Sequence, residues 1–215
     1  NPSGRVLERA ELDAIGEFVL RNDLLVLADE IHADVIFDGR RHVPFASLSP
    51  ELARRTVTFN SATKSFNLAG LRAALAIFGT PELMQRFHYL PARTLGGLSA
   101  LNSSAAALAW NECEDWLEAT LSYLQANRDY LAERLPRDLA GIEFRLPEST
   151  FLAWLDCSNL ELPQPGFDFF LEKARVAFSD GRPFGPGGEN CIRLNFATSR
   201  QVLDAALDRM RAALP

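Results

Sequence analysis

The sequence predicts an α/β protein with a second, smaller α+β domain, and three observations support this prediction. Apolar residues recur at helical spacing over residues 8–22, and a short continuous apolar run follows at residues 24–28. Such a run is typical of a strand covered on both faces, as in a parallel sheet. Two further runs, at residues 56–59 and 73–78, alternate with helical patterns. This alternation indicates a layered α/β architecture.

The pattern changes in the second half of the chain. Residues 81–134 have a mostly helical pattern, and Pro136 predicts a helix end. Beyond it come short strand-like runs and two helical patterns, at residues 142–144, 151–155, 167–175, 176–178, 192–195 and 201–213. We therefore predict a larger domain over residues 1–120 and a smaller one over residues 121–215.

Length and composition exclude several classes of protein. The 215 residues, 47% hydrophobic and 23% charged, are typical of a globular protein with a sizeable core. Because 22 Lys and Arg oppose 28 Asp and Glu, the net charge is -6. This charge, without a basic stripe, argues against a nucleic-acid partner. No apolar run reaches the length of a membrane span. We expect a cytoplasmic protein that binds neither nucleic acid nor membrane.

The three cysteines, Cys113, Cys157 and Cys191, lie far apart and form no C-x-x-C pair. This spacing fits neither a zinc site nor a disulfide framework. We expect buried thiols in a reducing compartment, and no metal site.

The segment SATKSFNLAGLR, residues 61–72, carries the strongest chemical signal. Lys64 lies just past the carboxyl end of a predicted buried strand, where open α/β sheets place ligands. Small hydroxylated residues precede it, and Arg72 follows eight positions later. Lysines in dry, cationic surroundings become nucleophiles and form Schiff bases. A single loop lysine usually points into solvent, but the whole pattern favours a functional site.

Three other segments carry polar residues beside predicted strands or turns. Asp29 follows the first apolar run, where a carboxylate can pair with a protonated pyridine nitrogen. Taken alone, Asp29 is better explained as a helix cap after a strand. Asn1 opens the sequence NPSG, which turn chemistry also explains. Arg193, in the sequence RLN, offers a planar fork for a carboxylate, and Arg200 is the competing candidate.

These four segments, in this order, resemble the class I and II aminotransferases, which are fold type I enzymes that use pyridoxal 5′-phosphate. The resemblance covers essentially the whole chain. It implies a truncated large domain like that of aspartate aminotransferase, with a mostly parallel sheet and flanking helices, followed by the small domain. It also implies an amino acid as substrate and a homodimer when the protein is full length.

The resemblance assigns a role to each candidate residue of the cofactor site. Lys64 would form the internal aldimine and act as the catalytic base. Ser61 and Arg72 would hold the cofactor phosphate. Asn1 would bind the phenolic oxygen, and Asp29 would face the ring nitrogen.

The resemblance also indicates a substrate-binding residue, and residues 32–48 indicate a branch of the family. By the same likeness, Arg193 would bind the substrate carboxylate. Aminotransferases usually have a tyrosine three positions after the ring aspartate, and here that position is His32. The runs HADVIFDG and HVPFASL resemble the cystathionine β-lyase branch, whose members cleave a carbon–sulfur bond. We interpret His32 as a cofactor-binding residue that takes over the tyrosine's hydrogen bond to the phenolic oxygen.

Three functions therefore stay open at this stage. The first is a C–S β-lyase that releases thiol, pyruvate and ammonia. The second is an aminotransferase that exchanges an amino group between an amino acid and a 2-oxo acid, because both reactions share the steps up to the carbanion. The third is a catalytically inactive module, since relatives carry a further stretch before the NPSG turn. We expect such a stretch to precede Asn1 in the full protein.

Overall fold

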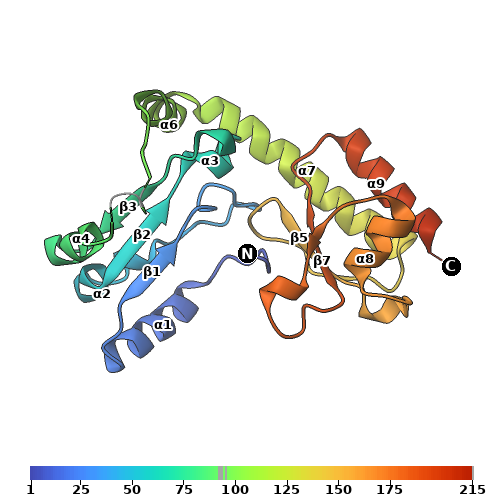
Figure 1. The fold of residues 1–215 in the computed structure, drawn as a ribbon, viewed down its shortest axis with the longest axis horizontal. Coiled ribbons are helices and arrows are strands. Elements are labelled where there is room, and N and C mark those ends of the chain that lie inside the picture. The colour runs from blue at the N-terminus through green and yellow to red at the C-terminus, as the bar shows by residue number, and fades with distance from the viewer. Residues whose placement is uncertain (92–93, 95, 215) are drawn as a thin grey trace. The chain divides into compact units, whose positions relative to one another are not determined.

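The computed structural model describes residues 1–91, 94 and 96–214, which form two compact units (Figure 1). The Lys64 unit comprises Val6–Ala119, and the Arg193 unit comprises Asn1–Arg5 together with Thr120–Pro215. The predicted first domain included residues 1–5, whereas the structure groups them with the Arg193 unit. Part of the helical pattern predicted for residues 81–134 falls on residues 92, 93 and 95, which lie outside the described residues.

The Lys64 unit is built on a three-stranded sheet with the order β1-β2-β3. β1 (Val26–Asp29) pairs in parallel with β2 (Thr56–Asn60), and β2 pairs antiparallel with β3 (Leu75–Phe78). The sheet is therefore mixed, and the prediction of a mostly parallel sheet was wrong here. The β2–β3 connection holds only a four-residue helix and a 3-10 turn. It lacks the long crossover helix that usually joins parallel strands.

Short helices and turns complete the Lys64 unit. They are α1 (Arg9–Arg21), η1 (Phe45–Ser47), α2 (Pro50–Arg54), α3 (Ala62–Ser65), η2 (Ala69–Leu71), α4 (Pro81–His88) and α6 (Ala100–Glu112). One hydrophobic cluster joins α1, η1 and α2 and consists of Leu12, Val19, Phe45 and Leu52. A second cluster packs α6 against the segment around α3 and consists of Ala62, Phe66, Ala73, Ala106 and Ala109.

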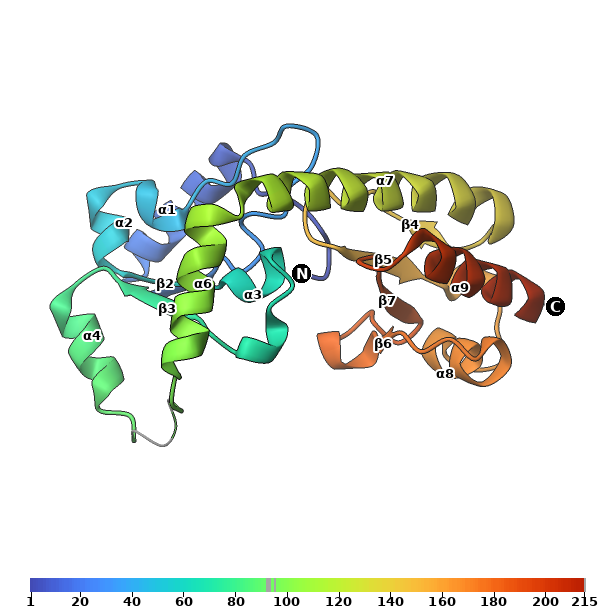
Figure 2. The same cartoon turned by 90° about the horizontal axis from the view of Figure 1, so that it is seen from above.

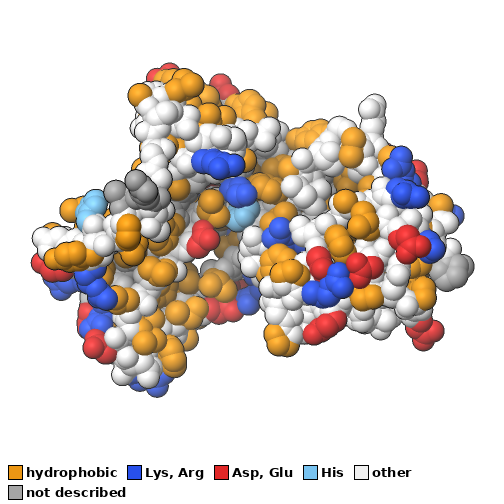
Figure 3. Space-filling model, in the orientation of Figure 1, with side chains coloured by type: hydrophobic (Ala, Val, Ile, Leu, Met, Phe, Trp, Pro, Cys, Tyr) orange, Lys and Arg blue, Asp and Glu red, His pale blue; other side chains and the backbone are white. Residues whose placement is uncertain are grey.

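Hydrophobic side chains remain on the surface of both outer strands of this sheet. Leu27 on β1 is 73% exposed, and Ile77 on β3 is 58% exposed. The space-filling view shows hydrophobic side chains at many points of the surface (Figure 3). Isolated exposed hydrophobic residues are common in proteins, and the helices α1 and α6 add further ones such as Phe18 and Leu101.

The Arg193 unit contains a four-stranded antiparallel sheet with the order β4-β5-β7-β6. Its strands are β4 (Glu143–Phe144), β5 (Leu152–Asp156), β6 (Ser179–Asp180) and β7 (Cys191–Asn195). The predicted strand at residues 176–178 was placed too early, because β6 forms three residues later. The helical elements are η3 (Ser158–Leu160), α8 (Gly166–Phe169), the π turn η4 (Phe170–Ala174), η5 (Arg182–Phe184) and α9 (Arg200–Ala213).

The long helix α7 (Glu114–Asp138) begins in the Lys64 unit and ends in the Arg193 unit, as Figure 2 shows along its length. The prediction that Pro136 ends this helix was wrong. α7 continues to Asp138, and the Leu139 amide still bonds to the Leu135 carbonyl. Proline removes one helical donor. Because Pro136 lies in the last turn, that loss does not stop the helix.

A buried arginine fastens α7 to α9. Arg134, whose side chain is only 9% exposed, lies 3.0 Å from Asp204 and 2.6 Å from Asp208 of α9. It also pairs with Asp138 and donates to the Tyr130 hydroxyl at 2.6 Å. Removing the partners of a buried charge leaves that charge uncompensated and lowers stability. We therefore expect this cluster to hold α7 and α9 together.

Replacing Arg134 by alanine should lower the free energy of unfolding of the complete protein by about 3 kcal/mol, because Asp204 and Asp208 of α9 lose their link to α7 and Asp138 keeps only Arg137. Arg137→Ala is the matched control, since Arg137 is 66% exposed on the same helix. Surface pairs contribute at most about 1 kcal/mol. Urea denaturation of both variants tests this. Equal losses would show that the Arg134 cluster does not fasten the helices.

The same cluster predicts a pH dependence. Hydrogen bonds from Arg137 and Arg134 hold the pKa of Asp138 well below its usual range. Because the folded pKa is lowered, the stabilisation is complete above the usual aspartate pKa of about 4. It is lost as the pH falls through the lowered folded value. The difference between wild type and Arg134→Ala should therefore shrink in acid, which urea titrations at several pH values would measure.

Candidate active site

Lys64 lies in a short turn directly after β2. Ser61 caps α3, because its Oγ accepts the Thr63 amide at 3.1 Å. Thr63 and Ser65, on either side of the lysine, are buried, whereas Lys64 is exposed. The turn therefore fixes its hydroxylated residues inside and presents the lysine outward.

Two contacts hold the Lys64 turn in place. The Ser65 hydroxyl donates to a carboxylate oxygen of Asp34 at 2.8 Å. On the other side, Phe66 is buried and stacks on Trp116 with 6.0 Å between ring centroids. Since Ser65 and Phe66 follow Lys64 directly, these contacts limit the positions that the lysine can adopt.

Four of the predicted residues lie at one edge of the β1-β2-β3 sheet. Asp29 is the last residue of β1, and Ser61 and Lys64 follow the end of β2, which runs parallel to β1. Arg72 precedes β3, which begins at this same edge because it runs antiparallel. The carboxyl ends of strands are where open α/β sheets bind ligands. The structure thus brings these four residues together as a group.

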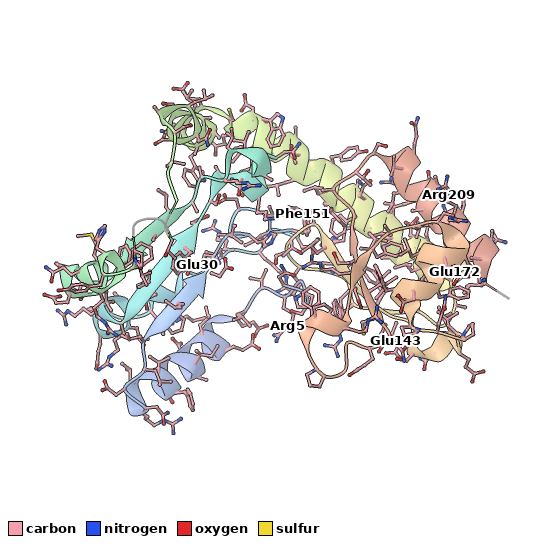
Figure 4. All side chains as sticks on the ribbon, in the orientation of Figure 1. Arg5, Glu30, Glu143, Phe151, Glu172 and Arg209 are labelled. Carbon is pink, nitrogen blue, oxygen red and sulfur yellow. The ribbon has the colours of Figure 1, made fainter. Side chains whose placement is uncertain are left out.

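Asp29 is exposed, and its carboxylate accepts the Ile31 amide at 3.3 Å. The next residue, Glu30 (labelled in Figure 4), accepts the Phe45 amide at 3.0 Å and lies 2.9 Å from Nε2 of His42. Burial alone would raise the pKa of Glu30, but the bonds to His42 and Phe45 outweigh it and lower that pKa. Glu30, the residue after β1, thereby holds His42 and Phe45 close to the end of that strand.

The two predicted phosphate ligands differ in their surroundings. Ser61 is 1% exposed, and its hydroxyl donates to the Ala73 carbonyl at 2.5 Å. Its single proton would have to turn away from Ala73 to reach a phosphate oxygen. Arg72 is exposed and has a left-handed backbone with φ of 50°. A side-chain-bearing residue rarely adopts this conformation, which is concentrated at functional sites. Both phosphate roles stay predictions.

His32 lies in the turn after Asp29 and is partly buried. Its carbonyl accepts the Val35 amide at 3.0 Å, which shapes the turn. Binding of a phenolic oxygen by His32 stays a prediction, because the contact that defines this role is to the cofactor.

The remaining two predicted residues meet in the Arg193 unit. Arg193 on β7 lies directly between Trp154 of β5 and Ser179 of β6. One terminal nitrogen, Nη1, donates to Asn1 Oδ1 at 3.0 Å, and Nη2 donates to Ser179 Oγ at 3.1 Å. The Phe184 ring centroid is 4.8 Å from Arg193 Cζ. Among the described residues, no hydrogen-bond partner exists for the buried Nε of Arg193. A guanidinium has five N–H donors. The bonds to Asn1 and Ser179 use one donor each of Nη1 and Nη2, so a second donor on each of these nitrogens remains for a ligand.

The NPSG turn holds Asn1 in this position. The Gly4 carbonyl accepts the backbone amides of Glu148 and Ser149 at 2.8 and 2.9 Å. Gly4 has a φ of +69°, and a Cβ there would lie 2.7 Å from Cβ of Pro147. Glycine is therefore required for this close approach. These contacts also explain why residues 1–5 belong to the Arg193 unit.

The competing arginine, Arg200, begins α9 and bonds to α7 within its own unit. It donates to Asn127 Oδ1 at 3.0 Å and to the Ala126 carbonyl at 2.8 Å. Its guanidinium lies 4.0 Å from the Tyr130 ring centroid. These contacts favour a structural role for Arg200 and leave Arg193 as the candidate for carboxylate binding.

Two of the three cysteines, Cys157 and Cys191, are buried and offer little nucleophilic character, whereas Cys113 is partly exposed. Burial raises the pKa of the Cys157 thiol to about 12, and it also raises the pKa of Cys191. Both thiols are thus protonated near neutral pH. Within residues 1–91, 94 and 96–214, no group of three or more His, Cys, Asp and Glu side chains is arranged to hold a metal ion. None of the described helices has the length and hydropathy to cross a membrane.

Comparison with known proteins identifies the family of this chain. The family model for aminotransferases of class I and II matches residues 1–210. The chain belongs to this family. Cystathionine beta-lyase PatB of Bacillus subtilis (strain 168) is 36% identical to it over 222 residues, covering 100% of this chain and 56% of PatB. The chain spans about half the length of the relatives it matches.

Solved structures of other proteins have the same fold over this length. OvoB matches with a TM-score of 0.93 and 45% identity, covering 100% of this chain and 55% of OvoB. Cystalysin from Treponema denticola, which contains pyridoxal 5′-phosphate, matches with a TM-score of 0.93 and 32% identity, at 100% and 55% coverage. The two units therefore correspond to part of the α/β fold of the fold type I pyridoxal-phosphate enzymes.

The residues of this aminotransferase-family chain fit the cofactor's chemical requirements. Lys64 supplies an exposed amine, Asp29 an exposed carboxylate for a protonated ring nitrogen, and Arg72 an exposed cation for phosphate. Arg193 donates to Asn1, so the oxygen of that carboxamide faces the arginine. The nitrogen is then the end suited to donate to a phenolic oxygen.

The sequence did not predict several residues around the site. Ser65 and Asp34 are 31 residues apart, and Trp154 and Ser179 reach Arg193 only through strand pairing. The hydroxyl directly after Lys64 was the one available signal for Ser65. For the partners of Arg193, the sequence offers no local signal, because register between distant strands decides them.

Proposed function

We propose that the complete protein is a pyridoxal-phosphate-dependent C–S β-lyase that acts on cystathionine-like amino acids. The observation that carries this proposal is the exposed Lys64 amine, held between buried neighbours at the sheet edge where Asp29 ends β1. Family membership supports the cofactor. The resemblance of residues 32–48 to the lyase branch, together with the likeness to PatB, supports the reaction.

The proposal combines two residue sets that the structure describes in separate units. From the Arg193 unit, Arg193 binds the substrate α-carboxylate through its planar fork. From the Lys64 unit, Asp29 holds a proton on the pyridine nitrogen, and Arg72 binds the phosphate. When bound, pyridoxal phosphate supplies a ring that accepts the electrons of the Cα–H bond.

Lys64 moves the proton in this scheme. Its neutral amine removes the α-proton as a general base. The electron pair left on Cα then forms the Cα–Cβ double bond, the Cβ–S bond breaks, and the thiolate leaves with the sulfur electrons. The released enamine takes up water to give pyruvate and ammonia. Thiol, pyruvate and ammonia thus account for all atoms of substrate and water.

The alternative within the family is transamination, which uses the same residues and differs in the destination of the proton held by Lys64. The other alternative is that the 215-residue chain by itself is a catalytically inactive module. The segment around His32 resembles the lyase branch, and for this reason we rank the lyase first.

The test is a direct comparison of the two reactions in the complete, cofactor-loaded protein. We expect pyruvate, ammonia and thiol to form from cystathionine faster than amino groups move between glutamate or aspartate and a 2-oxo acid. Lys64→Ala in the same preparation corrects for background chemistry. Faster transamination would promote the aminotransferase, and absence of both reactions in the complete protein would contradict the proposal. The same assay on the 215-residue chain alone tests whether it is inactive by itself.

A further inference from the structure

An aromatic side chain covers the proposed carboxylate-binding arginine. Phe184 lies with its ring centroid 4.8 Å from Arg193 Cζ. The same ring meets Trp154 edge-on, at 5.2 Å between centroids and an interplanar angle of 73°. Trp154 is also the direct cross-strand neighbour of Arg193. Arg193, Trp154 and Phe184 therefore form one cluster on this sheet.

The loop that carries Phe184 is fixed to the strand that carries Arg193. The Gly181 amide donates to the Cys191 carbonyl at 3.0 Å, and the Phe184 amide donates to the Gly181 carbonyl at 3.0 Å. A Cβ at Gly181 would lie 2.3 Å from the Cys191 oxygen, so the loop can approach β7 this closely only with glycine. Cys191 precedes Arg193 by two residues. The backbone position of Phe184 relative to β7 is therefore fixed.

The cover restricts how a ligand can approach the guanidinium. An aromatic face attracts the cation and shields it from water. Because Arg193 Cζ lies over the Phe184 ring, the ring limits approach from that side, and we expect a ligand to meet Arg193 at its N–H donors. Asn1 and Ser179 already fix Nη1 and Nη2. A flat carboxylate suits this approach, because its two oxygens match parallel N–H groups.

We infer that Phe184 is a specificity-determining residue that selects the carboxylate of the substrate by capping the Arg193 guanidinium. This inference rests on the proposed role of Arg193. Phe184 is 42% exposed, so its replacement should leave the core intact. The pairing of charge with carboxylate strengthens as water is excluded, and the cap thereby favours amino acids over amines of the same size.

Calorimetric binding of L-alanine and ethylamine to the complete, cofactor-loaded protein tests this inference, since the two ligands differ only in the carboxylate. In Phe184→Ala, the Kd for L-alanine should rise roughly fivefold, as expected from losing a partly exposed cation–π contact. The Kd for ethylamine should stay unchanged. Phe184→Tyr should restore wild-type binding, and Phe184→Leu, which keeps the bulk without the ring, should not.

A double-mutant comparison separates this inference from the proposed function. In an Arg193→Ala background, Phe184→Ala should have no further effect on L-alanine, because the two residues act as a unit. If Arg193→Ala weakens L-alanine and Phe184→Ala does not, the cap is overturned while the role of Arg193 stands. Equal weakening of both ligands by Phe184→Ala also overturns it. If Arg193→Ala has no effect on L-alanine, both assignments fail.

Discussion

Replacing Lys64 by alanine in the complete protein should reduce β-elimination by at least roughly 10²–10⁴-fold, the contribution of a positioned general base. The loss should exceed that range if the covalent link to the cofactor also fails. The turn itself should survive, because Ser61, Ser65 and Phe66 anchor it through contacts that do not involve the lysine side chain. Steady-state pyruvate release measures the effect.

The chain offers a matched control for this variant. Lys64 and Lys173 are the two lysines in the sequence. Lys173 belongs to η4 and forms an exposed pair with Glu172 at 2.7 Å. Lys173→Ala should therefore keep wild-type activity. Comparable rates in both variants would remove Lys64 from the reaction.

Arg193→Ala should raise KM for amino-acid substrates about 10- to 150-fold, because a hydrogen bond to a charged group contributes about 1.5–3 kcal/mol. Cofactor loading should persist, since the predicted cofactor ligands other than Asn1 lie in the Lys64 unit. Arg182→Ala is the control. Arg182 precedes Phe184 in the same loop, but its side chain pairs with Asp168 and Asp180 at the surface.

Steady-state kinetics and absorbance of the bound cofactor would separate the two effects of Arg193→Ala. A raised KM with normal cofactor content is the predicted result. An unchanged KM would assign the carboxylate to a different residue. Loss of cofactor with an unchanged KM would instead make Arg193 a partner of Asn1 in holding the phenolic oxygen.

Local patterns in the sequence predicted much of this fold. The apolar run at residues 24–28 and the β-type run at residues 56–59 located β1 and β2, although burial of β1 on both faces was wrong, since Leu27 is exposed. The position of Lys64 after β2, and of Asp29 at the end of β1, follows from this assignment. Helical periodicity likewise located α1 and α9, each of which buries one apolar stripe.

Features that depend on distant pairing could not be read in this way. The antiparallel direction of β3 depends on how residues 61–74 return to the sheet, and apolar content carries no direction. The low helix propensity of proline predicts a helix end at Pro136. Propensity does not take into account that Pro136 lies in the last turn of α7. The cap over Arg193 arises from the register of β5 and β7 and from a loop approach that only Gly181 permits. Such features follow from tertiary packing.

The central claim is that Lys64 carries the cofactor, and borohydride reduction tests it most directly. The complete protein would be loaded with pyridoxal phosphate, reduced, digested and mapped by mass spectrometry. This chain contains two lysines, Lys64 and Lys173. Within these 215 residues, the pyridoxyl group can therefore lie on one of only two lysine-containing peptides. We predict the pyridoxyl group on the peptide that contains Lys64. A pyridoxyl group on Lys173, or on a lysine outside these 215 residues with Lys64 unmodified, would contradict the account.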